Sequence, residues 1–279
     1  MSDSRIIIKA KTPLFDLKLD ELVEYKDLIW LFFKRNYSIR YKQTILGPAW
    51  LVISPLFTIF AYTILFGRLA GLSTDGIPQP LFYLSGTIFW NFFSECFSGT
   101  ANTFTGNAGI FGKVYFPRLT IPVSNLLTCL ADFIIRFIML LIFIAYYALN
   151  NYGVFISWKI IMLPLLILQE ALLAMSVGII VSSVTTKYRD LQVLVGFGLQ
   201  LWMYATPVIY STSIVPDSWK EIFLLNPVTP SLLLFKNALF CTEIFDFKYA
   251  IYASCTTLIL LFAGIVIFNR VEKTFMDTV

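Results

Sequence analysis

Six long apolar runs constrain this chain more than any other feature. A helix needs roughly 20 mostly apolar residues to cross the hydrocarbon core of a bilayer. Runs of about that length lie at 49–66, 81–101, 119–149, 159–184, 193–209 and 249–268. The composition agrees, because 58% of the 279 residues are hydrophobic and only 14% are charged, whereas soluble domains carry about 25% charged residues. The sequence therefore predicts an all-α membrane protein with six transmembrane helices, and it argues against a soluble or disordered chain.

A seventh apolar segment, 219–240, is interrupted by polar and helix-breaking residues. Asn226, Pro227, Pro230 and Lys236 divide it. A broken segment of this kind survives at membrane depth only where its backbone is buried in protein or lines an aqueous space. We therefore expect a re-entrant pair of half-helices before the last span, with two further full spans as the alternative.

The distribution of Lys and Arg predicts the orientation. Fifteen of the 21 lie before the first run, in the second-to-third and fourth-to-fifth connections, or after the last run. Five lie on the opposite side, and Arg136 lies within a run. Positive residues favour the cytoplasmic side, so both termini are predicted to be cytoplasmic, as an even number of spans requires.

The segment before the first run does not have the pattern of a cleavable signal peptide, because it is charged and its first long apolar run starts too late. Residues 21–41 instead predict an amphipathic helix at the cytoplasmic membrane surface. Its apolar residues recur at helical spacing: Leu22, Tyr25, Ile29, Phe32 and Phe33. A packed cytoplasmic helix without lipid contact is the alternative. The predicted organisation is a cytoplasmic N-terminal segment (1–48), a six-helix transmembrane domain (49–268) and a cytoplasmic tail (269–279).

Four ionisable residues lie near the middle of predicted spans: Glu95, Asp132, Arg136 and Glu170. Ionisable residues inside the membrane are costly and usually face protein or water. Asp132 and Arg136 are four residues apart, which is the spacing of an intrahelical pair. We expect a structural ion cluster in which Arg136 is held by Asp132, with Glu95 or Glu170 as further partners. A proton or substrate relay and a direct role in gating are the alternatives.

The first and fifth spans carry uncharged polar and aromatic side chains. Such side chains suit a hydroxyl-rich ligand or a hydrated pore, because phenols and amides bond hydroxyls while rings stack on the apolar faces of sugars. The candidates for a substrate path are Phe57, Phe60, Tyr62, Phe66, Gln192, Gln200, Tyr204 and Tyr210. Ordinary helix contacts and an interfacial aromatic belt are the alternative explanation.

The chain lacks the residues that imidazole chemistry and P-loop nucleotide binding require. The chain has no His, so no imidazole can act as a base or a metal ligand. The only Gly-Lys pair, Gly112-Lys113, lacks the upstream Gly and the following Ser or Thr of a P-loop, so no nucleotide-phosphate site is predicted. We expect no catalytic residue, no metal and no cofactor in this chain. The energy for any transport would come from another subunit or from an ion gradient.

Four short strings, in order along the chain, resemble the permease subunits of bacterial ABC transporters that export polysaccharides. They are RYKQTILGPAW (40–50), KVYFPR (113–118), KYRDL (187–191) and NPVTP (226–230). The resemblance runs from about Leu14 to the C-terminus. It is greatest to the O-antigen exporter type, with capsule and teichoic acid exporters as relatives.

The resemblance implies a homodimer in the bacterial inner membrane, with two cytoplasmic P-loop ATPase subunits that bind ATP and Mg²⁺. Residues 107–118 would form a coupling helix on the ATPase, and 185–191 a second contact. The implied coupling residues are Asn107, Ile110, Phe111, Lys113, Tyr115, Arg118, Lys187 and Arg189. Segment 219–240 would form outer gate helices, and the first and fifth spans of both protomers would line the polymer path.

The implied substrate is an undecaprenyl-diphosphate-linked glycan made in the cytoplasm. Clustered cations suit phosphate oxygens, so Arg35, Arg40 and Lys42 are candidates for binding the diphosphate. Ordinary positive-inside anchoring is the alternative for each of them. Two other classes remain open for the whole chain: an ABC permease for a drug, haem or lipid, and a stand-alone membrane enzyme or flippase.

Overall fold

A computed structural model of the protein describes residues 19–42, 44–111, 113–114, 116–150, 152, 158–186, 190–241 and 247–274. All regular structure in these ranges is helical. The elements are α1 (Leu19–Glu24), α2 (Lys26–Tyr41), η1 (Gly47–Ala49), α3 (Trp50–Tyr62), η2 (Thr63–Leu69), α4 (Gln79–Ala101), α5 (Thr103–Phe111), α6 (Thr120–Leu149), η3 (Trp158–Met162), α7 (Leu163–Thr185), α8 (Leu191–Tyr204), η4 (Thr212–Ile214), α9 (Asp217–Leu225), α10 (Val228–Phe240) and α11 (Phe247–Thr274). The prediction of an all-α protein is confirmed.

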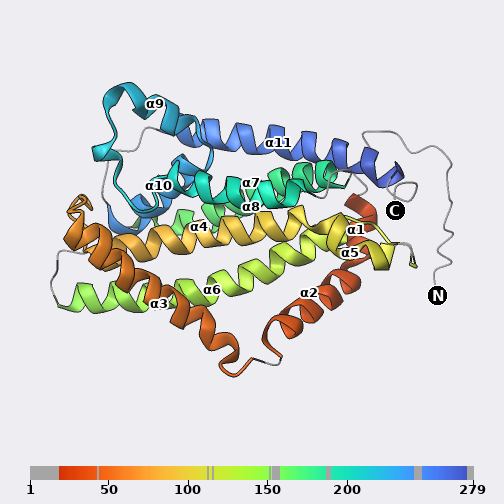
Figure 1. Cartoon of the computed structure of the whole chain (residues 1–279), viewed down its shortest axis with the longest axis horizontal. Helices are drawn as coiled ribbons and strands as arrows, with labels where there is room; N and C mark the ends of the chain where they lie inside the picture. The colour runs from red at the N-terminus through yellow and green to blue at the C-terminus, as the bar shows by residue number, and fades with distance from the viewer. Residues whose placement is uncertain are drawn as a thin grey trace.

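Helix α4 lies at the centre of the bundle. It packs against α6 and α7, and α7 packs in turn against α11 (Figure 1). Most of its residues are buried, including polar ones. Several of its buried hydroxyls bond to their own helix, as when Thr87 donates to the Tyr83 carbonyl at 2.7 Å, whereas the hydroxyls of Tyr83 and Thr100 have no hydrogen-bond partner among the described residues. Because protein surrounds α4 and part of its polar groups is satisfied locally, its polar content is tolerated.

Four helical stretches are long and apolar enough to cross a bilayer: Gly47–Leu69, Thr120–Leu149, Trp158–Thr185 and Lys248–Val271. They correspond to the first, third, fourth and last predicted spans. The second predicted span is α4, which is not among these four. The six-span count therefore stays a prediction.

The fifth predicted span, 193–209, is shorter in the structure than expected. Helix α8 has 14 residues and ends at Tyr204. Pro207 lacks the backbone donor that a continuing helix needs, and the chain turns there, with the Thr206 amide donating to the Met203 carbonyl. The expected helix 193–209 is thus wrong at its C-terminal end, because the helix ends at Tyr204.

The broken segment forms two helices, α9 and α10, which meet at an angle of 99°. The Asn226 side chain holds the bend. Its Oδ1 accepts hydrogen bonds from the Trp202 indole at 2.9 Å and from the Val228 backbone amide at 3.2 Å. Its Nδ2 donates to the Thr206 hydroxyl at 2.9 Å. Helix α10 is largely buried against α7 and α4. The break that the sequence predicted is confirmed, and its geometry is that of a broken span or a re-entrant loop. The re-entrant form stays a prediction.

The N-terminal helices lie against the bundle. Helix α2 packs along α6 (Figure 1), and its Phe32 is buried 5.4 Å from the Phe116 ring. After α2, the chain turns at Gly47, whose φ of +51° lies in the region that favours glycine. Pro48 then occupies the first turn of η1. Residues 44–49, within the 40–50 string, thus form an elbow between α2 and α3.

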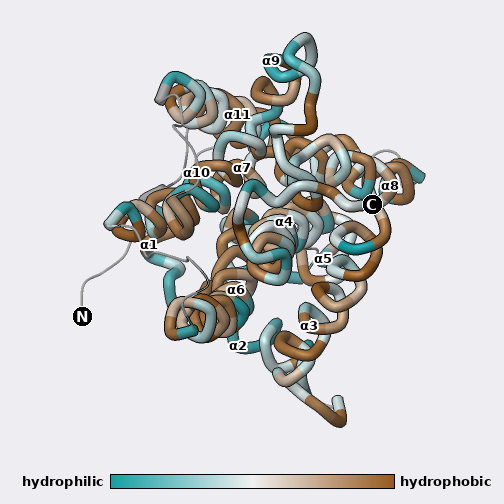
Figure 2. Tube along the Cα trace, turned by 90° about the vertical axis from the view of Figure 1, so that its left-hand side faces the viewer, coloured by the Kyte–Doolittle hydropathy of each residue, from teal (hydrophilic) through white to brown (hydrophobic). Residues whose placement is uncertain are grey.

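Apolar side chains also cover the outside of the bundle. Figure 2 shows brown segments on outer helices as well as in the interior. Large exposed residues lie on α3 (Leu56, Phe57, Phe60) and on α8 (Val193, Leu194, Phe197, Leu201). An apolar exterior of this extent suits lipid or a protein partner.

Glycine allows α4 and α7 to approach closely. A Cβ added at Gly178 would lie 2.7 Å from Cβ of Thr100 and 2.9 Å from the Phe97 carbonyl oxygen. Gly178→Ala is therefore expected to destabilise the protein by about 1–3 kcal/mol through overpacking. Thermal unfolding of the detergent-solubilised protein measures the effect. Gly198→Ala on α8 is the matched control, because a Cβ there meets nothing within 4 Å. Equal unfolding temperatures for the two variants would contradict this account of the contact.

Candidate functional site

Two ion pairs join three helices near the middle of the bundle. The Arg40 guanidinium, at the end of α2, donates to the Asp132 carboxylate on α6. The Tyr41 hydroxyl donates to the other Asp132 oxygen at 2.7 Å. One turn further along α6, Arg136 donates to Glu95 of α4 at 2.6 Å. These contacts connect α2, α6 and α4 through charged side chains.

The expected intrahelical pair between Asp132 and Arg136 is therefore wrong. Each of the two side chains meets a partner on a different neighbouring helix, because α6 lies between α2 and α4. The expectation that Glu95 holds Arg136 is correct. The spacing of four residues could not identify these partners, since it says nothing about what packs beside α6.

Glu170 stands apart from the ion pairs. It is fully buried on α7, and neither of its carboxyl oxygens has a hydrogen-bond partner. Its neighbour Gln169 donates to the Ser231 hydroxyl of α10 at 3.3 Å. The predicted four-residue cluster thus reduces to Glu95, Asp132 and Arg136, with Arg40 as the fourth member that the sequence did not place there.

A cavity of about 360 Å³ lies beside the ion pairs, and we call it the elbow cavity. Its lining comes from the end of α2, the elbow, the start of α3, and the facing sides of α4 and α6: Arg40, Tyr41, Thr44, Gly47, Trp50, Leu51, Glu95 and Arg136. Nε and Nη1 of Arg136 and Oε2 of Glu95 have no hydrogen-bond partner. The cavity therefore combines aromatic rings, hydroxyls and incompletely paired charges.

The three diphosphate candidates lie in different surroundings. Arg40 forms an ion pair with Asp132. Arg35 stacks over the Phe32 ring at 4.6 Å and donates to Asn36 at 3.2 Å. Lys42 is exposed just after the end of α2. The structure brings Arg40 and Arg136 to the elbow cavity, but Arg35 and Lys42 are not in its lining.

Of the path candidates on α3 and η2, Phe57 and Phe60 are exposed. Tyr62 and Phe66 are half-buried, with their rings 5.3 Å apart, and Tyr62 also packs 6.1 Å from Tyr83. Phe57 and Phe60 therefore point away from the bundle, whereas Tyr62 helps to pack this segment on α4.

The path candidates on and after α8 divide in the same way. Gln200 and Tyr204 are exposed. Gln192 instead donates to the Thr105 hydroxyl at 2.6 Å, which ties α8 to α5. It also lines a smaller cavity of about 140 Å³ between α4, α7 and α8. Tyr210 donates to the Tyr204 carbonyl at 2.9 Å and so closes the turn after α8.

The predicted coupling segment contains the short helix α5. Asn107 and Ile110 are half-buried and Lys113 is exposed. Phe111 is buried and packs 5.6 Å from Phe116, so its ring faces the bundle rather than a partner. Arg118 lies 5.2 Å above the Phe111 ring. Tyr115, Lys187 and Arg189 lie outside the described residues.

An aromatic cluster connects this segment with the N-terminal helix. Phe116 contacts Phe111 on one side and Phe32 of α2 on the other, at 5.6 and 5.4 Å. Phe104 of α5 extends the cluster to Phe268 of α11 at 4.6 Å. Phe116 lies within the KVYFPR string, but the sequence does not single it out, because one Phe in a loop gives no periodic signal.

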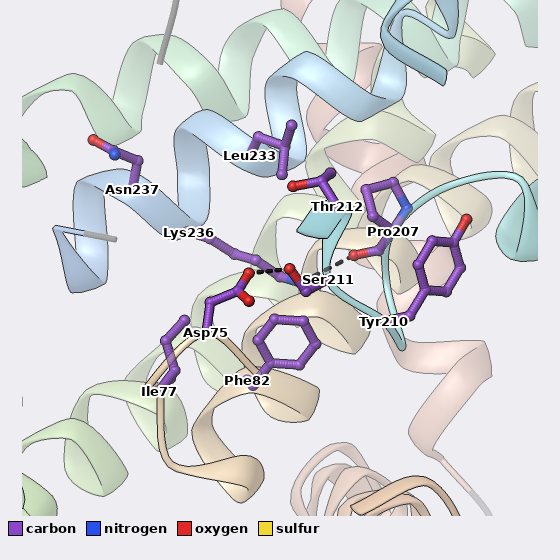
Figure 3. A pocket seen from close by; sticks show the side chains of 10 residues that line it. All are labelled: Asp75, Ile77, Phe82, Pro207, Tyr210, Ser211, Thr212, Leu233, Lys236 and Asn237. Carbon is purple, nitrogen blue, oxygen red and sulfur yellow. Dashed lines mark hydrogen bonds between the residues drawn. The ribbon is translucent and has the colours of Figure 1, made fainter. Parts of the chain in front are cut away.

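A polar cluster that the sequence did not predict lies beside α10 and the loop before α4, at the end of the bundle away from α5 (Figure 1). Figure 3 shows its residues from close by. Asp75 accepts hydrogen bonds from Ser211 and, at 2.8 Å, from Ser213. Lys236 of α10 donates to the Pro207 carbonyl at 3.0 Å and lies 3.6 Å above the Phe82 ring. These contacts tie the loop before α4, the segment after α8 and α10 together around a space of about 30 Å³.

No group of three or more His, Cys, Asp or Glu side chains within the described ranges could hold a metal ion. The residues that line the elbow cavity offer hydrogen-bonding groups, aromatic rings and charges.

Comparison with known proteins shows the family. The ABC-2 type transporter family matches residues 27–240, which is well over half of the chain. The chain belongs to the ABC-2 transporter family. An ABC-2 membrane permease is not itself catalytic, and membership implies an ABC transporter with a partner ATPase. The resemblance read from the four strings is confirmed at the level of this family.

Relatives within the ABC-2 family carry transport names. The chain is 27% identical over 252 residues to the O-antigen export system permease protein RfbA of Klebsiella pneumoniae, covering 90% of this chain and 94% of the relative. It is 26% identical over 263 residues to RfbA of Myxococcus xanthus, covering 93% and 98%. It is 21% identical over 251 residues to the polysialic acid transport protein KpsM of Escherichia coli, covering 88% and 94%.

Arg136→Met tests the pair between α6 and α4 in this ABC-2 permease. The variant is expected to lose about 3 kcal/mol of folding free energy, because Glu95 keeps its charge without a partner. The double variant Glu95→Met, Arg136→Met is expected to recover part of this loss. Thermal unfolding in detergent gives both values. Lys220→Met at the exposed Asp217 pair is the control, with an expected loss below about 1 kcal/mol. A wild-type unfolding temperature for Arg136→Met would refute a stabilising role.

Proposed function

We propose that this chain is the permease subunit of an ABC transporter that exports lipid-linked polysaccharide, of the O-antigen type, across the inner membrane. The observation that carries the proposal is the similarity to RfbA proteins, which extends over 90% of this chain and 94% of the relative. A similarity confined to one motif would support membership of the ABC-2 family but not the O-antigen type of exporter. The apolar helices support a multi-pass membrane location, and the Lys and Arg distribution supports cytoplasmic termini.

The proposed polymer path runs between two copies of the chain. Phe57 and Phe60 on α3 and Gln200 and Tyr204 on α8 project outward, so a second protomer facing these helices would enclose them. Uncharged polar and aromatic walls would hold a glycan weakly and allow it to slide. Tyr62, Phe66, Gln192 and Tyr210 belong to the same proposal, although their present contacts are within the protomer.

The proposed coupling surface for the ATPase centres on α5 and the segment after it. Asn107, Ile110 and Lys113 are accessible there, with Arg118 beside them. Phe111 would act indirectly, by anchoring the segment to Phe116 and thereby to α2. Tyr115, Lys187 and Arg189 stay candidates from the resemblance.

The lipid diphosphate is proposed to bind near the end of α2. Arg35 and Lys42 carry their charges close to this end, and Arg40 lies between them in sequence. Guanidinium and ammonium groups bind phosphate oxygens with charge-assisted hydrogen bonds. Because Arg40 already pairs with Asp132, Arg35 and Lys42 would make the main contribution.

A capsule exporter permease is the second candidate. The similarity to KpsM covers 88% of the chain and 94% of that relative, but at the lower identity of 21%. The two candidates differ in the product that reaches the surface, which is a glycan attached to lipopolysaccharide in one case and a capsule in the other.

Deletion and complementation of the gene in its native host test the function. Loss of this chain is expected to remove the surface glycan and to leave lipid-linked glycan on the cytoplasmic side, because synthesis continues without export. Immunoblotting of surface lipopolysaccharide and extraction of lipid-linked intermediates measure the two pools. Complementation with the wild-type gene is the matched control. An unchanged surface glycan in the deletion strain would overturn the proposal, and a missing capsule with intact lipopolysaccharide would favour the second candidate.

Phe116→Ala tests the proposed coupling route. Removing this ring separates Phe111 from Phe32, so movement of α5 would reach α2 less effectively. A coupling loss of about 1 kcal/mol predicts a several-fold fall in export, with ATP hydrolysis by the assembled complex retained. Phe262→Ala on the exposed side of α11 is the control and should leave export unchanged. Equal fractional losses of export and ATP hydrolysis for Phe116→Ala would contradict a coupling role.

A further inference from the structure

One face of α2 carries a ladder of aromatic rings that ends at the elbow cavity. Trp30 stacks on Phe33 with ring centroids 4.9 Å apart, and Phe33 lies 6.1 Å from Tyr37. Tyr37 lies 4.8 Å from Tyr41, which lines the cavity. Side chains three and four residues apart share one face of a helix. At a rise of 1.5 Å per residue, the ladder is about 16 Å long.

Two tryptophan rings near the ladder are accessible. Trp30 is 52% exposed at the start of the ladder, and Trp50, which lines the cavity together with Tyr41, is 49% exposed. Rings that serve only to fill a core are covered by the fold. Tyr41 and Trp50 instead line a concave space, in which two rings can contact the same bound group.

The cavity lies about halfway along the bundle and is open to the outside at the elbow, where Thr44 and Trp50 are exposed. Asp132, which holds the end of α2, is 12 residues from the start of α6 at Thr120, or about 18 Å along the helix. Figure 1 shows α2 running from the end of the bundle that holds α5 toward the elbow before α3. The ladder therefore connects that end of the bundle with a cavity about halfway along it.

The charges around the cavity balance. Two guanidinium groups, Arg40 and Arg136, face two carboxylates, Asp132 and Glu95, in two ion pairs. A diphosphate placed in the cavity would approach the Glu95 carboxylate, and like charges repel at short range. The balance favours an uncharged ligand.

The residues that line the cavity nevertheless offer both hydrogen-bond donors and acceptors. Arg136 has two unpaired donors, Nε and Nη1, and Glu95 has one unpaired acceptor, Oε2. A hydroxyl group both donates and accepts, whereas a phosphate oxygen only accepts. These atoms are covered in the present conformation, so a ligand reaches them after rotation of the guanidinium. Adjacent hydroxyls could then satisfy Arg136 and Glu95 together.

We propose that the elbow cavity binds an uncharged sugar ring, and that the α2 ladder guides the saccharide into it. The volume of about 360 Å³ lies at the lower end of the roughly 300–1,000 Å³ typical of small-ligand sites and accommodates a short stretch of glycan. Trp50 and Tyr41 stack on the ring, while Arg136 and Glu95 bond its hydroxyls. The inference deepens the proposed function and rests on it, because it assigns the glycan part of the same substrate to this cavity.

Direct binding to the full permease–ATPase complex in nanodiscs tests the site. The probe is the free oligosaccharide released by mild acid from the host's own surface polysaccharide, and binding is measured by isothermal titration calorimetry. Trp50→Leu is expected to weaken binding about fivefold to tenfold through loss of the stacked ring. Trp50→Phe keeps a ring and is expected to retain most of the affinity.

Trp158→Leu is the matched control, because this Trp is also exposed but lies in η3, away from the cavity. It should bind the oligosaccharide as the wild type does. Size-exclusion chromatography with the ATPase shows whether each variant folds and assembles. If Trp50→Leu misfolds, Trp50→Phe and Tyr41→Phe still report on the site, since the latter keeps the ring and removes the bond to Asp132.

Three outcomes would overturn the inference: wild-type affinity in Trp50→Leu, equal weakening by Trp50→Leu and Trp50→Phe, or binding of inorganic pyrophosphate in competition with the oligosaccharide. The last outcome would make the cavity a phosphate site. Export by the wild-type chain separates this inference from the proposed function. If export occurs but the variants bind normally, only the sugar site fails. If the deletion strain keeps its surface glycan, the proposed function itself fails.

Discussion

The pair between Arg40 and Asp132 determines how the N-terminal third of the protein is arranged. Asp132 is fully buried on α6 and receives both the Arg40 guanidinium and the Tyr41 hydroxyl. A buried carboxylate is costly without partners, so the end of α2 must lie beside the middle of α6. The elbow at Gly47, the start of α3 and the elbow cavity all take their positions from this contact.

The two ends of the bundle are connected in different ways. At the end that carries α5, apolar rings join the predicted coupling segment to α2 and α11, with Phe116 between Phe111 and Phe32. At the other end, hydrogen bonds from Ser211 and Ser213 to Asp75 join polar loops. Ring packing tolerates small sliding motions, whereas hydrogen bonds require defined geometry. The first arrangement therefore leaves room for small movements between helices, and the second holds the loops in one geometry.

The apolar runs predicted most of the fold, because burial in a bilayer imposes a length that a sequence displays directly. The all-helical class and the break at Asn226 and Pro227 follow from that pattern. Predictions from the sequence were wrong where a side chain's partner lies on another helix that packs beside it. Spacing suggested Asp132 with Arg136, but the partners come from α2 and α4. Asp75 lies in a short polar loop and gave no signal, since its partners are more than 130 residues away.

The distance in sequence between Arg40 and Asp132 has a consequence for biosynthesis. The two residues are 92 positions apart, so α2 leaves the ribosome long before its partner on α6 exists. Until α6 is made, Arg40 and Tyr41 lack the carboxylate that holds the end of α2. The first span must therefore be inserted while its preceding helix is undocked, and the elbow closes only afterwards. Helix α2 is therefore synthesised early, but its contact with α6 forms late.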